Sequence, residues 1–334
     1  MVAASRELGN SLRALIALSI LIAVLYPIIG WLRPGFEVIL TYGVILAIAA
    51  LGFNLLFGYT GLLSFGHAAF FGVGAYTIGL TLKYLNLRAL EAQIFIAVVA
   101  ALLFSALTGF IVVRYRGIFF AILILVIAQT LWGFYVKFYH ITGGTDGIRI
   151  LRPVILGFYD TRGLGYDDFN MIYHYYALAW FILMAYLMWR IINSPFGYTL
   201  KMIRDAEDRA QTLGIDTFKF KLAAFIISAL YVAVSGALYA PLNRIVTPDL
   251  AYWTVSGKMV FMSILGGFTY YMGPIVGALI YVYFETVAQA ITVHWFLIMG
   301  VLIIATMVLT PTGLMGLVDR PSFKKTLSLL KLPI

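Results

Sequence analysis

The sequence contains ten apolar runs that are long enough, or nearly long enough, to cross a bilayer as helices. They lie at about 12–30, 37–57, 62–82, 92–113, 117–136, 171–190, 219–240, 255–268, 272–291 and 294–311. A spanning helix needs roughly 20 mostly apolar residues, and none of the runs alternates in polarity as a barrel strand does. The chain is therefore predicted to be an all-α integral membrane protein. We expect a polytopic helical bundle of nine or ten spans, because the eighth run is short enough to be re-entrant.

The composition agrees with this prediction and excludes a large soluble domain. Of the 334 residues, 63% are hydrophobic and 11% are charged, whereas a soluble domain carries about 25% charged residues. The net charge of +9 would suggest nucleic acid as a partner of a soluble protein. Here it is better explained by basic loops on the cytoplasmic side, so no nucleic-acid partner is predicted. Cysteine is absent, which excludes disulfides and thiolate metal sites.

The basic residues also predict an orientation. With the N-terminus inside, most of the 23 Lys and Arg residues lie on the cytoplasmic side, and many of them gather at 190–221. The first run is interpreted as a retained helix, since no small-residue cleavage site follows it. We expect a multi-pass protein of the cytoplasmic (inner or plasma) membrane with both termini in the cytoplasm.

Two connections are longer than the usual two to eight residues. The connection at 137–170 is expected to be external, and the one at 193–217 is internal and carries the signals of a short amphipathic helix. Ser194 and Pro195 suit an N-cap and a first turn, and Gly214 suits a C-cap. Apolar residues recur at three- and four-residue steps, while the other face carries charges of both signs. The apolar face comprises Met202, Ile203, Ala206, Ala210 and Leu213. The charged face comprises Lys201, Arg204, Asp205, Asp208 and Arg209.

A charged face of mixed sign favours a docking element for a cytoplasmic partner, because simple attraction to anionic lipid would favour Lys and Arg alone. The alternative is an interfacial helix that only fastens the loop to the membrane surface.

Catalysis and metal binding find little support in the sequence. The four histidines, His67, His140, His174 and His294, lack the paired spacing of a metal site, and no Walker A phosphate-binding loop occurs. We therefore predict no catalytic residue, no metal and no cofactor, and any ATP hydrolysis must reside on another polypeptide.

Glu285 is the only acid well inside a predicted span, and it shares one helical stripe with Tyr281 and Gln289. Ionisable groups within spans are functional candidates by default, and a proton-coupled carrier would need such a carboxylate. No Lys, Arg or His in another span offers Glu285 a clear partner. A structural role, or a position near the external end of its helix, is the alternative.

The third run is rich in small residues. Ser64, Gly66, His67, Gly72 and Gly74 lie within it, directly after the turn Gly58-Tyr59-Thr60-Gly61. Small residues let helices approach closely, and glycine-rich spans can break where they line a cavity. Helix packing alone explains most of this pattern, and similar spacings occur at 236–240 and 273–277.

The run at 58–77, GYTGLLSFGHAAFFGVGAYT, resembles the signature of the permeases of branched-chain amino-acid ABC transporters, in particular their M-type subunit. Four further blocks agree in the same order, and the resemblance covers about 50–320. They are RGIFFA at 116–121, TGGTDG at 142–147, SPFG at 194–197 with IRD at 203–205 and GI at 214–215, and LGG at 265–267 with GPIVGA at 273–278.

This resemblance implies a transmembrane permease domain over 1–318, with a fold similar to that of vitamin B12-type importers, and a cytoplasmic tail over 319–334. It also implies four kinds of partner: a second, H-type permease, two cytoplasmic ABC ATPases, an external substrate-binding protein and membrane lipid. The helix at 194–216 then looks like the element that couples to the ATPase, and residues 208–214 loosely follow its usual motif, with Asp208 for Glu and Arg209 for Ala.

The resemblance assigns three groups of site residues. Coupling to the ATPase would involve Lys201, Met202, Ile203, Arg204, Asp205, Ala206, Asp208, Ala210 and Gly214. Of these, Met202, Ile203 and Ala206 would enter the ATPase groove, and Arg204 and Asp205 would fix the orientation. The translocation path would involve Ser64, Gly66, His67, Gly72, Gly74 and Glu285. The binding protein would dock on the loop at 137–170, which contains Gly143, Gly144 and Asp146.

Three other functions stay open at this point. A secondary, ion-coupled carrier would work alone through Glu285. A passive channel is disfavoured because no ring of charge or filter sequence is visible. Related permeases could carry urea, short amides or other amino acids in place of branched-chain amino acids.

Overall fold

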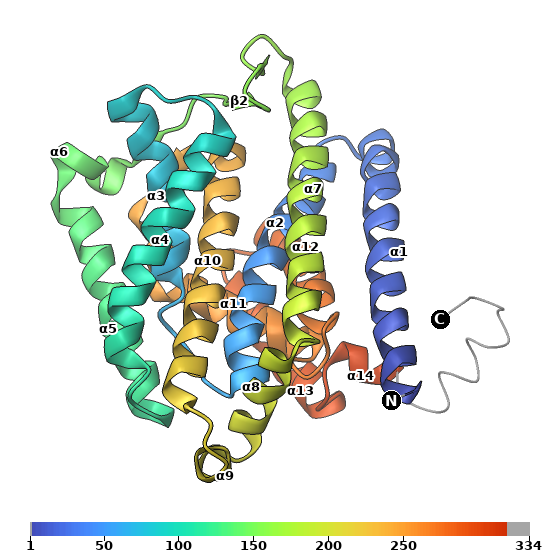
Figure 1. The fold of residues 1–334 in the computed structure, drawn as a ribbon. Coiled ribbons are helices and arrows are strands. Elements are labelled where there is room, and N and C mark those ends of the chain that lie inside the picture. Colours follow the sequence, from blue (N-terminus) through green and yellow to red (C-terminus); the bar gives the residue numbers. More distant parts are fainter. Residues whose placement is uncertain (1, 319–334) are drawn as a thin grey trace, which may run out of the picture.

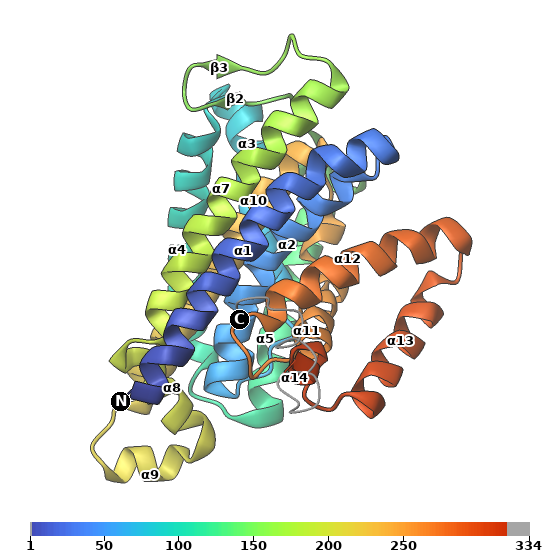
Figure 2. The same ribbon diagram turned by 90° about the vertical axis from the view of Figure 1, so that its right-hand side faces the viewer.

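The computed structural model describes residues 2–318, so the tail predicted at 319–334 lies outside the described residues. Within them the chain forms a helical bundle with small β-hairpin-like pairs at one end and two short helices at the other (Figures 1 and 2). We call these the hairpin end, which carries β2 (Val154–Ile155) and β3 (Tyr159–Asp160), and the α9 end, which carries α9 (Glu207–Thr212).

In the described part, nine helical segments are long and apolar enough to span a bilayer, which agrees with the predicted nine or ten. Five are single helices: α3 (Ala68–Leu85), α4 (Leu90–Val112), α5 (Gly117–Lys137), α7 (Tyr166–Ile192) and α10 (Thr217–Asn243). The others are α12 (Gly273–Ile291), the apolar part of α1 (Val2–Leu32), α2 (Glu37–Asn54) with its π-helical extension η1 (Leu55–Tyr59), and α13 (Trp295–Leu309) with α14 (Leu314–Val318).

The eighth apolar run forms α11 (Trp253–Gly266), which has 14 residues and is about 21 Å long. It is shorter than the nine spans, but it runs antiparallel to α12 and packs against α12 and α2 inside the bundle. It therefore carries the chain back from the hairpin end, and the start of α1 and α14 lie toward the same end of the bundle (Figure 1). The core of the bundle is formed by α2, α3 and α10, whereas α5, α1 and α13 are the most exposed spans.

The remaining elements lie outside the spans. At the hairpin end, β1 (Ile148–Arg149) pairs antiparallel with β4 (Ile245–Val246), and β2 pairs antiparallel with β3. The same region contains α6 (Tyr139–Thr142), η2 (Gly144–Asp146) and η3 (Pro248–Ala251). At the α9 end, α8 (Pro195–Asp205) precedes α9.

The third span is broken, which corrects the continuous helix expected at 62–82. Helix α3 begins only at Ala68, and the segment from Gly61 to His67 is not helical. Gly61 has a φ of +77°, and a Cβ atom on Gly66 would collide with the backbone of Ile124 on α5, so this stretch fits tightly against its neighbours. Non-helical backbone is tolerated at membrane depth where it is buried in protein.

Helices α3 and α10 cross at a point where each contributes a glycine. A Cβ atom on Gly74 would collide with the carbonyl oxygen of Ala233, and one on Gly236 would collide with the carbonyl oxygen of Phe71. The small-residue spacing seen in the sequence therefore marks a close helix contact, as expected for packing in a membrane protein.

Changing Gly74 to alanine should destabilise the protein by about 1–3 kcal/mol, because the added methyl group forces two backbones apart in a packed core. Gly133→Ala on α5 is the matched control, since no atom lies within 4 Å of the position that its Cβ would take. Thermal unfolding in detergent compares the two variants with the original chain. Equal melting midpoints for both variants would contradict the close contact.

In the hairpin of α12 and α13, α12 packs against α2 and α11, whereas α13 stands apart from the rest of the bundle. Figure 2 shows that the turn between these helices lies lower than the upper ends of α1, α3 and α7. On α13, Met299 and Ile303 are the buried residues. Most of this helix is therefore free to contact lipid or another subunit.

Candidate functional site

The amphipathic segment at 194–216 forms two helices, not the single one predicted. Ala206 has a φ of −159° and a ψ of 82°, which ends α8 and makes a corner before α9. The predicted end signals are confirmed in part. Pro195 is the first residue of α8, and Gly214, with a φ of +82°, follows the end of α9. Ser194 occupies the N-cap position, but its hydroxyl donates to the carbonyl oxygen of Ile191 at 2.6 Å.

The side of α8 that packs against the bundle includes Ile203, which is only 2% exposed. This corrects the expectation that Ile203 enters the groove of a partner, because the side chain is already part of the core of this chain. Arg204 is also anchored internally. Its guanidinium donates to the carbonyl oxygen of Gly58 at 2.6 Å and lies 2.9 Å from Asp205.

A different set of apolar side chains faces outward at the α9 end. Tyr198 and Met202 lie one turn apart on α8 and are 51% and 42% exposed, and Leu213 after α9 is 72% exposed. Among the remaining predicted coupling residues, Asp205, Asp208 and Gly214 are exposed, Lys201 and Ala206 are half-buried, and Ala210 is buried. The Lys201 ammonium lies 5.3 Å from the ring centroid of Tyr59 and 5.4 Å from that of Tyr198.

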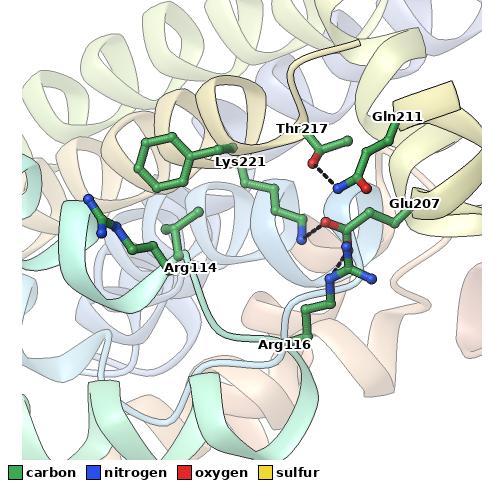
Figure 3. A pocket seen from close by; sticks show the side chains of 8 residues that line it. Arg114, Arg116, Glu207, Gln211, Thr217 and Lys221 are labelled. Carbon is green, nitrogen blue, oxygen red and sulfur yellow. Dashed lines mark hydrogen bonds and ion pairs between the residues drawn. The ribbon is translucent and has the colours of Figure 1, made fainter. Parts of the chain in front are cut away.

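Glu207 is the centre of a charged network behind this surface (Figure 3). One carboxylate oxygen is 3.1 Å from the Nε atom of Arg116, which precedes α5, and the other is paired with the ammonium of Lys221 on α10. Arg116 also binds Asp208 at 3.0 Å. The Lys221 side chain is 4% exposed and that of Glu207 is 18% exposed, so this part of the network is shielded from water.

The network borders a pocket of about 240 Å³ that also contains Gln211 and Thr217, whose side chains are joined by a hydrogen bond of 2.9 Å. The arrangement fixes α9 to the loop between α4 and α5 and to the start of α10. Sequence patterns single out neither Glu207 nor Lys221, because the charges that they meet lie on other elements of the chain.

The predicted path residues lie in the interior of the bundle. His67 is fully buried, with Nδ1 hydrogen-bonded to the Ser64 hydroxyl at 2.6 Å and Nε2 to the Ser228 hydroxyl at 2.8 Å. Phenylalanine rings surround the imidazole edge-on, with centroids 5.5–5.9 Å away, and belong to Phe53, Phe70 and Phe225. Gly66, Gly72 and Gly74 are also buried and contact neighbouring backbone or Ala251.

Glu285 has a basic partner, which corrects the expectation of none. Its carboxylate lies 2.6 Å from the ammonium of Lys258 on α11. This pair could not be predicted from the sequence, because Lys258, the one charged residue of α11, meets Glu285 only when α11 packs against α12. Along the predicted stripe, Tyr281 and Glu285 are buried and Gln289 is exposed.

The connection at 137–170 is folded against the bundle. Gly143 and Gly144 have positive φ, which a tight turn requires, and Asp146 accepts a hydrogen bond from Tyr139 at 3.2 Å. Glu91 on α4 holds the turn between β2 and β3 by accepting from the backbone N–H of Leu156 at 2.7 Å. Within this turn Phe158 is 80% exposed.

An ion pair joins Asp160 at the end of β3 to Arg162, which follows it. The hydrogen bond from the side chain of Arg162 lowers the pKa of Asp160 to about 2, so this carboxylate stays ionised at neutral pH. Among residues 2–318, no group of three or more Asp, Glu or His side chains is placed to hold a metal ion.

Comparison with known proteins places the chain among transport proteins. The family described as the permease component of branched-chain amino acid transport systems matches residues 35–307. The high-affinity branched-chain amino acid transport system permease protein LivM of Escherichia coli (strain K12) is 29% identical over 324 residues, covering 91% of this chain and 76% of that protein. LivH, a permease protein described in the same terms from the same organism, is 23% identical over 297 residues, covering 85% of this chain and 94% of LivH.

A third relative is the guanosine ABC transporter permease protein NupQ of Bacillus subtilis (strain 168). It is 27% identical over 232 residues, covering 66% of this chain and 70% of that protein. No solved structure matches the chain significantly.

Proposed function

Because the chain belongs to the family of permease components of branched-chain amino acid transport systems, we propose that it is the M-type permease subunit of an ATP-driven importer. In this function it moves branched-chain or related amino acids across the cytoplasmic membrane by alternating access. The family match over 35–307 carries this proposal, since it includes nearly all of the membrane-spanning part. The chain is a permease component and not an enzyme, so ATP hydrolysis resides on other subunits.

The proposed assembly adds a second, H-type permease, two cytoplasmic ABC ATPases and an external substrate-binding protein. Similarity to both LivM and LivH supports the pairing of two permeases. We place the α9 end and both termini, including the tail at 319–334, in the cytoplasm, because basic residues gather at 190–221. The hairpin end then faces the binding protein, with 1–318 forming one permease domain.

In this mechanism the ATPase contacts the exposed residues of α8 and α9. Tyr198, Met202 and Leu213 supply apolar contact area, and Asp205 and Asp208 fix the orientation. Movement of α9 reaches α5 and α10 through Glu207, because that carboxylate binds Arg116 and Lys221 together. The spans then move as rigid bodies about a path at the interface of the two permeases.

The path proposed from the sequence comprises the glycine-rich third span and Glu285. Ser64, Gly66, His67, Gly72 and Gly74 contribute to it as the rigid packing layer that holds the broken span in place, since all five are buried within this chain.

Reconstitution into proteoliposomes tests the proposed function. The complete assembly should accumulate leucine, isoleucine or valine only when ATP is supplied to the ATPases and binding protein is present. Uptake by the purified chain alone, driven by a proton or sodium gradient, would instead establish the secondary carrier. Uptake of urea, short amides, other amino acids or guanosine in parallel assays defines the substrate class, and the relative NupQ makes guanosine a necessary comparison.

Met202→Asp should reduce the amount of ATPase that co-purifies with the permease about tenfold or more, because a charge would enter the apolar contact area. Met202 is 42% exposed, so the melting midpoint of the permease itself should not change. Phe158→Asp at the hairpin end is the matched control, and it should leave ATPase binding intact while weakening stimulation by the binding protein. Unchanged co-purification of the Met202 variant would contradict the proposed ATPase contact.

A further inference from the structure

Lys258 and Glu285 form an ion pair at membrane depth. Helices α11 and α12 run antiparallel, with Gly266 against Gly277 near one end and Lys258 against Glu285 further along. Glu285 lies about 18 Å from the first residue of α12 at a rise of about 1.5 Å per residue, and α12 continues beyond it to Ile291. Glu285 is therefore well inside the span α12, and Lys258 on α11 lies beside it at the same depth.

The surroundings of the pair are not those of a lipid-facing surface. The Lys258 side chain is 31% exposed, although an ammonium group facing hydrocarbon is strongly disfavoured. Gln289, one turn beyond Glu285, and His294, in the turn between α12 and α13, are polar and exposed. The turn itself is set below the upper ends of α1, α3 and α7 (Figure 2). This face must therefore border water or another subunit.

Stability alone does not require an ion pair here. Charged pairs removed from water gain little over well-packed neutral side chains, because the loss of hydration offsets their attraction. The same pair is well suited to exchange its partners with a solute that carries both charges. A zwitterion can enter between Lys258 and Glu285 and replace one ion pair by two.

We propose that Lys258 and Glu285 form a transient subsite that binds the α-carboxylate and α-ammonium groups of a zwitterionic amino acid during translocation. Lys258 takes the carboxylate and Glu285 takes the ammonium. The indole of Trp295, whose ring centroid lies 5.8 Å from the Lys258 ammonium, offers apolar surface beside the pair for the side chain of the solute. This inference rests on the proposed amino-acid transport.

The subsite predicts a preference for free amino acids over neutral solutes. Urea or a short amide carries no net charge at either end, so it cannot compensate for the separation of Lys258 from Glu285. When Lys258 and Glu285 separate, a zwitterion gives each of them a new partner of opposite charge. Because one ion pair is exchanged for two similar ones, entry is reversible and binding is weak, as passage through a path requires.

The experiment uses the complete transporter in proteoliposomes with the double substitution Lys258→Met and Glu285→Gln. This variant removes both charges together, so it leaves no uncompensated charge. We expect ATPase association, basal ATP hydrolysis and melting midpoint to be retained, while ATP-driven leucine uptake falls about tenfold or more, equivalent to about 1.4 kcal/mol. Thr286→Val is the control on α12, because the Thr286 hydroxyl donates to the carbonyl oxygen of Val282 in its own helix.

Any other result of this experiment contradicts the proposed subsite. Leucine uptake at the original rate by the double variant, or uptake that falls together with melting midpoint and ATPase association, would show a purely structural pair. If the original transporter takes up no amino acid, the proposed function itself fails and the subsite fails with it. Normal uptake by the original transporter separates these two failures.

Discussion

Replacement of Glu207 by alanine should destabilise the α9 end of the permease by about 3–5 kcal/mol, since it leaves the charge of Lys221 buried without a partner. The Lys221 side chain is 4% exposed, so water cannot replace the lost carboxylate. Arg116 loses one of its two acidic partners in the same variant. Chemical unfolding of the purified permease measures the stability. The ratio of leucine taken up to ATP hydrolysed measures the coupling, which should fall as α9 separates from α5 and α10.

Asp208→Ala provides the control for Glu207, because it removes a carboxylate that binds the same arginine but is 87% exposed. Its effect should stay below about 1 kcal/mol, as for other exposed ion pairs. The double substitution Glu207→Gln and Lys221→Met should recover most of the stability while coupling stays low. Equal losses of stability in the two alanine variants would refute the central role of Glu207.

His67→Ala should reduce stability by about 3–5 kcal/mol, the usual cost of removing a large buried ring. The imidazole is fully buried among three phenylalanine rings, and its loss also leaves the Ser64 and Ser228 hydroxyls without their shared partner. Thermal unfolding in detergent checks this value. His140→Ala is the control, since His140 is exposed and its substitution should change stability by less than about 0.5 kcal/mol.

The conservative variant His67→Gln separates the two roles of this residue. A glutamine amide keeps a donor and an acceptor in the same layer. Retained uptake at a normal melting midpoint would identify His67 as a packing residue of the third span. Lost uptake at a normal midpoint would place it in direct contact with the solute.

The helical architecture could be predicted from hydropathy, because each spanning helix needs a long apolar run that is visible in the local sequence. Nine of the expected runs coincide with helices that can span the bilayer, and the short eighth run became α11. The ends of helices could also be predicted where a single residue type determines the backbone conformation. Pro195 begins α8 and Gly214 follows α9 because each fixes a backbone angle by its own chemistry.

The features that escaped prediction depend on contacts between distant segments. The third span looks continuous in hydropathy, and its break before Ala68 becomes necessary only when Gly66 meets α5. The corner at Ala206 is invisible to helical periodicity, which continues through it. Ile203 and Met202 are neighbours of similar hydrophobicity, yet one is buried and the other exposed. Likewise, Lys258 becomes the partner of Glu285 only after α11 folds against α12.

The exposed position of α13 gives the permease an uneven hydrophobic thickness. Helix α13 has 15 residues and is about 22 Å long, so it crosses a hydrocarbon core of about 30 Å only together with α14. The break between the two helices lies in this crossing, so lipid beside α13 thins wherever α14 does not extend it in line, at a cost of a fraction of a kcal/mol for each ångström of mismatch. Bilayer thickness therefore acts on one edge of the molecule and favours burial of that edge against another protein.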